Sequence, residues 1–417
     1  MRPRAVIIGG GVVGLASAWY LLRDGWQVSI VERGPPEHDS CSLGNAGLVT
    51  PSHFVPLAAP GVAAMALRSV FTPRSAVRVE PRINFDFLRW GWKFLRAANA
   101  RQARSAGPLL RDFCLLSREC YTELDTAWNH NFGFERRGVT MLVRDARHLA
   151  AERQLALQAR QLGLVTEELS AAELAARHKG LRLDVLAGMH FPIDSHLDPN
   201  RLNAELTARL REQGAEFLWH TEACGWRLES DRVAALRTNR GELQADEFIL
   251  AAGSWTPMLA TGLDLRLMVE PGKGYSLSLP APPAMPAKPL ILVEARIAVT
   301  PLADTLRFAG TMQFAGRDLR LESHRSAAMI AAVSQYLPDF PPPVFAGVEP
   351  WAGLRPVTPD GLPLLGRAPR QKNLTIATGH AMIGVTLAPA TGLLVAQLLG
   401  GRPTSLPLDW LRPERFS

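Results

Sequence analysis

Three glycines near the start of the chain have the spacing of a turn that binds a dinucleotide. Gly9, Gly11 and Gly14 follow the apolar run 5–8 and precede a segment with helical periodicity. Gly9 would allow a tight strand-to-helix turn, Gly11 a close approach of the backbone to a pyrophosphate, and Gly14 close packing of the helix on the strand. The N-terminus of that helix would then direct free N–H groups at the phosphates.

An acidic residue completes the pattern. Glu32 ends a second apolar run and lies 18 residues after Gly14, where a carboxylate can accept hydrogen bonds from ribose hydroxyls. An acid here disfavours a 2′-phosphate, so NADP is not expected. Val12, Val13 and Arg33 adjoin the turn and the acid and are expected to line the same site. The turn alone leaves FAD and NAD as alternatives, and a glycine-rich turn without a ligand is the least favoured interpretation.

Three later segments rich in small residues could also run beside a dinucleotide. They are the loop 40–47, the end of an apolar strand at 247–255, and the strand and turn at 373–384. For the loop, an ordinary surface position is the alternative interpretation. The residues expected to contact the cofactor are Ser42, Gly44, Asn45, Ala46, Gly47, Ala252, Gly253, Trp255, Gly379, His380, Gly384 and Thr386.

The fold must bring these segments together, although they are far apart in the sequence. A chain of 417 residues suits two closely joined domains. We expect residues 1–54, 146–260 and 346–417 to form an α/β, Rossmann-like cofactor domain. Residues 55–145 and 261–345 would form an interleaved substrate domain, and the alternating, proline-rich pattern of the latter range predicts a mainly antiparallel sheet.

The net charge of +7 is concentrated in one region. Residues 68–111 contain ten Arg or Lys and two acids, so the rest of the chain is nearly neutral. Within this region, a helix predicted over residues 85–98 has an apolar stripe beside a basic one. Such a helix is typical of contact with an anionic membrane surface, here through Phe85 to Arg104. A packing helix with a solvated basic side is the commoner alternative, and nucleic-acid binding is disfavoured because no recognised module accompanies the charge.

Several other classes of protein are disfavoured. No run of about 18 apolar residues is present, so no membrane-spanning helix is expected, and no signal peptide is apparent. The four cysteines are scattered without a CxxC pair or zinc spacing, which favours free thiols, a cytoplasmic protein and no metal site. They are Cys41, Cys114, Cys120 and Cys224.

Longer motifs show that the sequence resembles a known family, the FAD-dependent amine oxidoreductases that include D-amino-acid dehydrogenase and glycine oxidase. The resemblance covers nearly the whole chain and implies that the dinucleotide is FAD. Besides the N-terminal turn, it is carried by Gly44–Gly47, Phe191–Pro199, Ala251–Trp255, Lys273–Tyr275, Trp351–Gly361, Gly379–His380 and Leu387–Gly392.

The resemblance also implies a reaction and the residues that serve it. The reaction is oxidation of a D-amino or similar small amino acid to an imine, by hydride transfer to flavin N5, followed by hydrolysis to a 2-oxo acid. Arg355 occupies the position of the family's arginine that binds the substrate carboxylate, a contact well suited to a bidentate guanidinium; a structural salt bridge is its alternative role. Tyr275 would offer a second carboxylate contact. His380 has either a role near the flavin or a structural one.

Two positions depart from relatives within this family. Glycine-oxidase-like members carry an arginine where this chain has Met382, which implies a more apolar substrate site. Members that bind flavin covalently carry a cysteine near the position of Gly353, so non-covalent FAD is expected.

The loop 41–61 resembles the dehydrogenase branch, which passes electrons to a quinone-type acceptor at the inner face of the cell membrane. D-proline or a D-hydroxyproline is the specific substrate that this resemblance suggests. Two alternatives stay open, an oxidase that reduces O₂ and a non-catalytic flavin-binding subunit. The sequence does not indicate an oligomeric state.

Overall fold

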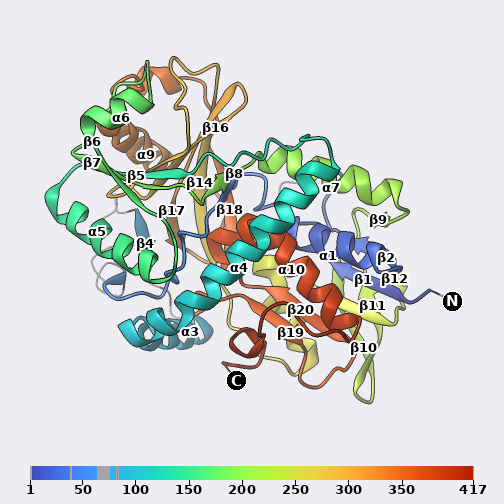
Figure 1. Ribbon diagram of the computed structural model, residues 1–417. Helices are drawn as coiled ribbons and strands as arrows, with labels where there is room; N and C mark the ends of the chain where they lie inside the picture. Colours follow the sequence, from blue (N-terminus) through green and yellow to red (C-terminus); the bar gives the residue numbers. More distant parts are fainter. Residues whose placement is uncertain (1, 38–39, 63–75, 81, 83, 417) are drawn as a thin grey trace.

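Two large β-sheets, one on each side of the view in Figure 1, organise the fold. The computed structural model describes residues 2–37, 40–62, 76–80, 82 and 84–416. The α/β class and the mainly antiparallel second sheet expected from the sequence are confirmed.

The first sheet has six strands in the order β19-β20-β13-β1-β2-β9. Neighbouring strands run parallel, except that β19 is antiparallel to β20. Because β1 and β13 are parallel neighbours, the turns that follow them meet at the same edge of the sheet. The bounds are β1 Arg4–Ile8, β2 Gln27–Val31, β9 Glu216–Leu218, β13 Glu247–Leu250, β19 Leu364–Arg367 and β20 Leu374–Thr378.

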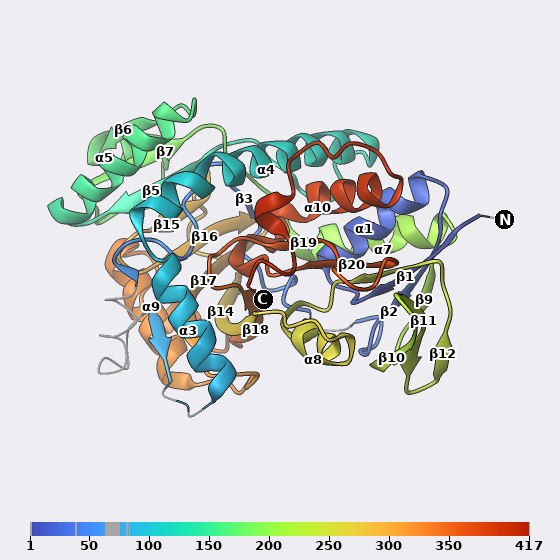
Figure 2. The same ribbon diagram turned by 90° about the horizontal axis from the view of Figure 1, so that it is seen from below.

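Helices cover one face of this sheet. Their apolar side chains and those of β1 and β2 form one continuous core, in which α10 packs against both α1 and α4 (Figure 2). The helices are α1 Val12–Arg23, α4 Ala100–Ala127, α7 Pro199–Glu212 and α10 Gly384–Leu399. Against the other face lie β10 Ala223–Glu229, β11 Arg232–Thr238, β12 Gly241–Leu243, α8 Thr256–Ala260 and α3 Phe85–Ala97.

The second sheet has nine strands in the order β18-β14-β17-β16-β15-β5-β7-β6, with β4 paired to β17. It is antiparallel except for the pairs β5–β15 and β4–β17. Helix α9 packs on the face remote from the first sheet. The strands are β4 Val77–Val79, β5 Val139–Val143, β6 Glu167–Ser170, β7 Ala187–Phe191, β14 Glu270–Pro280, β15 Leu290–Leu292, β16 Ile297–Leu302, β17 Thr305–Phe314 and β18 Trp351–Val357. The helices that contact this sheet are α5 Ala146–Gln161, α6 Ala171–Arg177 and α9 Ser323–Tyr336. A two-stranded ribbon, β3 Leu48–Val49 and β8 Ser195–His196, completes the strands.

The predicted domain boundaries do not coincide with changes of sheet. Residues 146–191, expected in the cofactor domain, supply β6 and β7 to the nine-stranded sheet, and so does β18 from the range 346–417. Helix α4, expected in the substrate domain, instead packs in the core of the six-stranded sheet, where the Tyr121 hydroxyl donates to the Val385 carbonyl (2.6 Å). Strand pairing is decided by long-range contacts, which the local pattern does not reveal.

The C-terminal helix is unusually apolar. The sequence was expected to contain no apolar run of membrane-spanning length, but within the described residues Ala381–Leu399 is one helical segment long and apolar enough to cross a membrane, and 61% of its apolar 18-residue window is buried inside the protein. Its contacts with α1 and α4 account for that composition, because a helix that is apolar all round belongs in a core.

Candidate active site

The glycine turn after β1 has the backbone that its sequence predicts. Gly9 has a φ of +115°, and a Cβ there would lie 2.6 Å from the Ala251 carbonyl oxygen. A Cβ on Gly14 would lie 2.0 Å from the Gly9 carbonyl oxygen, so both positions require glycine. At Gly11 the nearest atom to such a Cβ is 3.6 Å away, which leaves the start of α1 open to a ligand.

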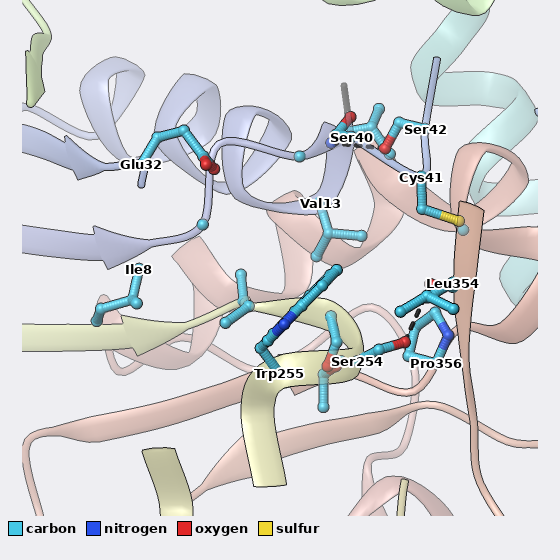
Figure 3. A pocket seen from close by; sticks show the side chains of 18 of the residues that line it. Ile8, Val13, Glu32, Ser40, Cys41, Ser42, Ser254, Trp255, Leu354 and Pro356 are labelled. Carbon is cyan, nitrogen blue, oxygen red and sulfur yellow. Dashed lines mark hydrogen bonds between the residues drawn. The ribbon is translucent and has the colours of Figure 1, made fainter. Parts of the chain in front are cut away.

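Glu32 is held beside this turn. Its carboxylate accepts hydrogen bonds from the N–H groups of Gly10 (2.8 Å) and Gly34 (2.9 Å). The next side chain, Arg33, stacks its guanidinium over the Trp255 ring at 3.9 Å. The acid is therefore fixed with its oxygens at the end of β2, where a ribose would lie. Figure 3 shows Glu32 and Trp255 on opposite sides of the cavity.

A cavity of about 480 Å³ runs from Glu32 to Arg355, between the edges of the two sheets. The turn after β13 closes one side, where the Ser254 hydroxyl donates to the Leu354 carbonyl of β18 (3.0 Å; Figure 3). Most of the predicted cofactor residues line this cavity: Gly9, Gly11, Val12, Val13, Glu32, Arg33, Ser42, Gly44, Asn45, Ala252, Gly253, Trp255, His380 and Gly384.

Five of the predicted cofactor residues do not line the cavity. Gly14, described above, is one of them, and three others maintain the conformation of the turns around the cavity. Gly47 has a φ of +74° and Gly379 a φ of +80°, and a Cβ at either would collide with a neighbouring residue. The Thr386 hydroxyl donates to the Leu48 carbonyl (2.7 Å), which ties α10 to β3. Ala46, in the same loop as Gly47, is not among the described residues that line the cavity.

The loop 40–47, for which a surface position was the alternative, forms one wall of the cavity. Its Ser42 hydroxyl accepts a hydrogen bond from the Val12 N–H at the start of α1 (3.1 Å). Its Asn45 side chain donates to the Met382 carbonyl (3.1 Å), in the turn that leads into α10. The loop thus connects two helix N-termini, whose N–H groups and partial positive charges face the cavity.

Arg355 lies at the far end of the cavity, on β18. Its guanidinium donates to the backbone carbonyls of Thr311 and, at 3.4 Å, Gly310 on β17. Gly274 provides the space, because a Cβ there would lie 2.2 Å from the guanidinium carbon. Burial lowers the pKa of Arg355, with Cys41 acting in the opposite direction, yet a guanidinium stays charged in proteins. Within the described chain it has no salt-bridge partner, so the alternative of a structural ion pair is not what the structure contains.

Tyr275 is not brought to this cavity. Side chains alternate along β14, and Gly274 faces Arg355, so Tyr275 points to the other face of the sheet. There it is 1% exposed in the core beneath α9, and its hydroxyl donates to Gln313 (3.5 Å). The structure therefore gives it no contact with a substrate carboxylate.

His380 lines the cavity but is committed to a structural bond. Its Nε2 lies 3.0 Å from the Thr391 hydroxyl, which itself donates to the Leu387 carbonyl (2.9 Å). The hydroxyl must therefore accept from Nε2–H. Burial lowers the pKa of His380 to about 3, so the ring is neutral near pH 7. Positive potential at this wall comes from the start of α10 rather than from an imidazolium.

Trp351 occupies the position that a covalent flavin link would need. A Cβ on Gly353 would lie 2.1 Å from its ring, and a Cβ on Gly44 would lie 2.0 Å from it. The indole is thus wedged between the cofactor loop and β18, and it leaves no room for a cysteine at 353. This packing supports the expectation of non-covalent binding.

Sequence reasoning missed three residues of this site. Trp351 and Cys41 line the cavity, and Arg307 of β17 donates to the carbonyls of Leu43 (2.7 Å) and Asn45 (2.9 Å) behind it. The first two lie inside motifs quoted above and carried a local signal. Arg307 lies in a strand far from any motif and carried none.

The cavity has the features that a flavin dinucleotide requires. A glycine turn and a helix N-terminus would hold the pyrophosphate, and Glu32 the ribose. The start of α10 would face the flavin end of the cavity, near Arg355. Bound there, FAD would supply a two-electron acceptor.

Comparisons with known proteins agree with the assignment of the cavity to a flavin dinucleotide. Residues 4–398 match the family described as FAD dependent oxidoreductase. The chain is 34% identical to a D-amino acid dehydrogenase of Paramagnetospirillum magneticum, over 99% of both chains, and 32% identical to one of Vibrio vulnificus, over 98% of this chain and 99% of that one.

Solved structures show the same fold. Glycine oxidase of Geobacillus kaustophilus superposes with a TM-score of 0.80, at 22% identity and 99% coverage of both chains. L-proline dehydrogenase of P. horikoshii gives 0.72, at 19% identity over 100% of this chain and 98% of that one. Together with the family match and the cavity, these similarities show that the chain belongs to the FAD-dependent oxidoreductase family and that its cofactor is FAD.

Proposed function

We propose that this protein oxidises a D-amino or D-imino acid to the corresponding imine, with hydride transfer to flavin N5. The observation that carries the proposal is Arg355, a partly buried guanidinium at the flavin end of the FAD cavity that has no carboxylate partner in the described chain. A substrate carboxylate would neutralise it and gain a bidentate contact. The D-amino acid dehydrogenases among its relatives support the substrate class.

The residues of the chain bind and orient rather than exchange protons. Arg355 would fix the carboxylate, and hence the α-carbon, against the flavin; such positioning can supply much of the rate. The neutral His380 ring already donates to Thr391 and has no role as a base in this account. A substrate that binds as the neutral amine needs none, because its nitrogen lone pair forms the C=N bond as hydride leaves carbon. Water then adds to the imine carbon. An acyclic imine gives the 2-oxo acid and ammonia, whereas the cyclic imine from D-proline opens to a 2-oxo acid that keeps the amine nitrogen in the same molecule.

Met382 replaces the arginine of glycine-oxidase-like members, but its side chain is 39% exposed and is not among the described residues that line the cavity. Only its backbone carbonyl is tied to the cavity wall, by the bond from Asn45. We propose D-proline or a D-hydroxyproline as the preferred substrate on the resemblance to the dehydrogenase branch. An anaerobic screen of D-amino and D-imino acids, read from the flavin absorbance, tests this. Faster reduction by glycine or acidic D-amino acids than by cyclic ones would contradict the choice.

We further propose a quinone as the electron acceptor. The dehydrogenase-like loop after residue 40 supports this, and the oxidase alternative predicts a different product. Turnover with a short-chain ubiquinone analogue should greatly exceed peroxide release in air. Peroxide formation at the rate of substrate oxidation would instead identify an oxidase. If the FAD-containing wild type turns over in neither assay, and Arg355→Ala therefore causes no loss, the protein binds flavin without catalysing this reaction.

A quinone acceptor requires access to a membrane, and helix α3 offers a suitable surface. Figure 1 shows α3 at the edge of the molecule. Its inner side is anchored by the buried Trp90, whose indole N–H donates to the Val357 carbonyl (3.0 Å). Its outer side exposes large apolar residues, with exposed fractions of 77% at Phe85, 57% at Leu88, 54% at Trp92 and 49% at Leu95.

Basic residues adjoin this apolar edge. Burial lowers the pKa of Lys93, and so does the positive charge of Arg89 and Arg96. The Arg96 guanidinium also lies 4.8 Å from the Trp92 ring centre. An apolar edge beside cationic groups matches the interface of an anionic bilayer, where each cation is worth about 1 kcal/mol. We propose peripheral contact through the range Phe85–Arg104 at the inner face of the cell membrane.

Vesicle sedimentation tests this surface. Binding to phosphatidylglycerol vesicles should exceed binding to phosphatidylcholine vesicles and fall with salt. The double variant Leu88→Ser/Trp92→Ser should lose it, whereas Leu157→Ser/Val165→Ser, on exposed apolar residues elsewhere, should not. Equal loss in both variants, or a dimer that buries α3 in solution, would contradict the membrane contact.

A further inference from the structure

The buried side chain of Arg307 joins the substrate sheet to the cofactor loop. It projects from β17, is 5% exposed, and donates from Nη1 to the carbonyls of Leu43 (2.7 Å) and Asn45 (2.9 Å). Its Nε donates to the Ser278 hydroxyl on β14 (3.1 Å), which fixes the side chain against the sheet. One guanidinium therefore joins β17 and β14 to the loop 40–47, which lines the cavity.

Asn200, at the start of α7, completes the arrangement. In the amide orientation that satisfies both of its polar groups, Asn200 accepts from Arg307 Nη2 (3.1 Å) and donates to the Leu43 carbonyl (3.0 Å). Within the described part of the chain, Arg307 has no salt bridge; its partners are neutral, although Asp198 raises its pKa against the lowering effect of burial. Burying a cation without a paired anion is costly, so the contacts with the loop must compensate.

The strand β17 also contacts Arg355, which lies on the second sheet's edge strand β18. The carbonyls of Gly310 and Thr311, three and four positions after Arg307 on β17, accept the hydrogen bonds of the Arg355 guanidinium. Thr311 has a φ of +60°, which is uncommon for a β-branched residue, and such strain is often retained at functional sites. β17 thus carries one arginine that fixes the cofactor loop and two carbonyls that fix the substrate-binding arginine.

The loop passes this constraint on to the cofactor site. Asn45, whose carbonyl Arg307 holds, donates through its side chain to the turn before α10. Ser42, three residues earlier, accepts from the start of α1. Moving the loop relative to β17 would therefore move the walls around the flavin relative to Arg355.

We propose that Arg307 is a positioning residue that sets the distance between the flavin and the carboxylate bound at Arg355. The proposal rests on the function proposed above for Arg355. An Arg307→Lys variant keeps the charge but cannot reach both carbonyls and Ser278 together. The FAD-containing Arg307→Lys variant should still bind substrate. The substrate α-carbon should, however, be less well aligned with the flavin.

Anaerobic rapid mixing of FAD-saturated protein with the best substrate separates these effects. For Arg307→Lys, the limiting rate of flavin reduction should fall by roughly 10- to 100-fold, because small displacements of reacting groups are costly. The substrate dissociation constant from the same titration should change by less than about threefold, because Arg355 is untouched. A matched control is Arg415→Lys, which alters a buried bidentate contact with Asp360 away from the cavity and should lower stability without slowing reduction.

A second readout does not depend on the substrate. The visible circular dichroism of bound FAD should change in Arg307→Lys and stay unchanged in Arg415→Lys, because only the former moves the flavin walls. If no amino acid reduces the wild-type flavin, the proposed function fails, and the dichroism still decides the role of Arg307. Wild-type reduction rates in Arg307→Lys, or a wild-type dichroism spectrum, would overturn the proposal.

Discussion

Replacing Arg355 with lysine or methionine probes the residue on which the proposed reaction depends. Lysine keeps a positive charge but lacks the planar fork, and methionine removes the charge at similar length. Methionine also gives up the hydrogen bonds to the Gly310 and Thr311 carbonyls, and lysine cannot reproduce them with the arginine's geometry. The folded variants should retain FAD, because its predicted contacts with the glycine turn, Glu32 and Trp255 do not involve Arg355.

The expected loss in kcat/KM follows from the number of hydrogen bonds that the substitution removes. A hydrogen bond to a charged group contributes about 1.5–3 kcal/mol, and a bidentate grip on a carboxylate makes two. Losing both would cost about 3–6 kcal/mol, which is roughly 10²–10⁴ in kcat/KM. Lysine should recover part of the binding through its charge, so Arg355→Lys should lie at the lower end of this range and Arg355→Met at the upper end.

Steady-state kinetics with an artificial electron acceptor, together with FAD content, distinguish the outcomes. We expect full FAD occupancy, a large rise in KM in both variants, and a further fall in kcat where the substrate is misaligned. Loss of affinity for a substrate analogue that lacks the carboxylate should be small. A kcat/KM within about threefold of wild type for Arg355→Met would refute the role of this residue.

Four further predictions concern other parts of the site and the core. Gly353→Cys should lower the amount of bound FAD and form no covalent flavin, because Trp351 occupies the space; a flavin that stays with the denatured protein would contradict this. Cys41 lines the cavity and Cys224 is exposed, so FAD should protect the former but not the latter from maleimide, as peptide mass spectrometry would show. Gly14→Ala should abolish FAD binding or folding, because its Cβ would lie 2.0 Å from the Gly9 carbonyl oxygen; a soluble, yellow variant would be unexpected. The free energy of unfolding should decrease as pH falls from about 6.5 toward 4, at up to roughly 1.4 kcal/mol per pH unit for each histidine that is neutral in the fold and protonated when unfolded. Urea titrations over this range test the slope, and a flat profile would contradict it. The histidines with pKa values lowered by burial are His53, His178, His190, His196 and His380, opposed by Glu152 and Asp194, whose pKa values burial raises to about 7.

Local patterns were sufficient for the parts of the site that depend on neighbouring residues. The turn after β1 could be predicted because a Cβ on Gly14 would meet the Gly9 carbonyl oxygen and the Ile7 side chain, all within residues 7–14. The helix predicted over residues 85–98 is observed as α3, Phe85–Ala97, capped by the Asn84 side chain. In both cases a short stretch of sequence contains the cause of its own conformation.

Other features depend on contacts between distant residues. The face on which Tyr275 lies is set by the alternation of β14 and by a register shift next to it, so a motif that contains a tyrosine does not establish its direction. The pairing of β7 with β5, and of β6 with β7, likewise places these two strands of the range 146–191 in the nine-stranded sheet. Arg307 contacts a loop that lies 262 residues earlier in the chain, and no local pattern predicts such a contact.

The central claim is that the cavity oxidises D-amino or D-imino acids at the flavin. The direct measurement is anaerobic mixing of the purified, FAD-containing protein with the D- and L-enantiomers of one amino acid, proline first, while the flavin absorbance is followed. The account predicts that the D-enantiomer bleaches the flavin and yields the imine or 2-oxo product, and that the L-enantiomer reacts far more slowly. Equal bleaching by both enantiomers, or no bleaching by any D-amino or D-imino acid, would contradict it.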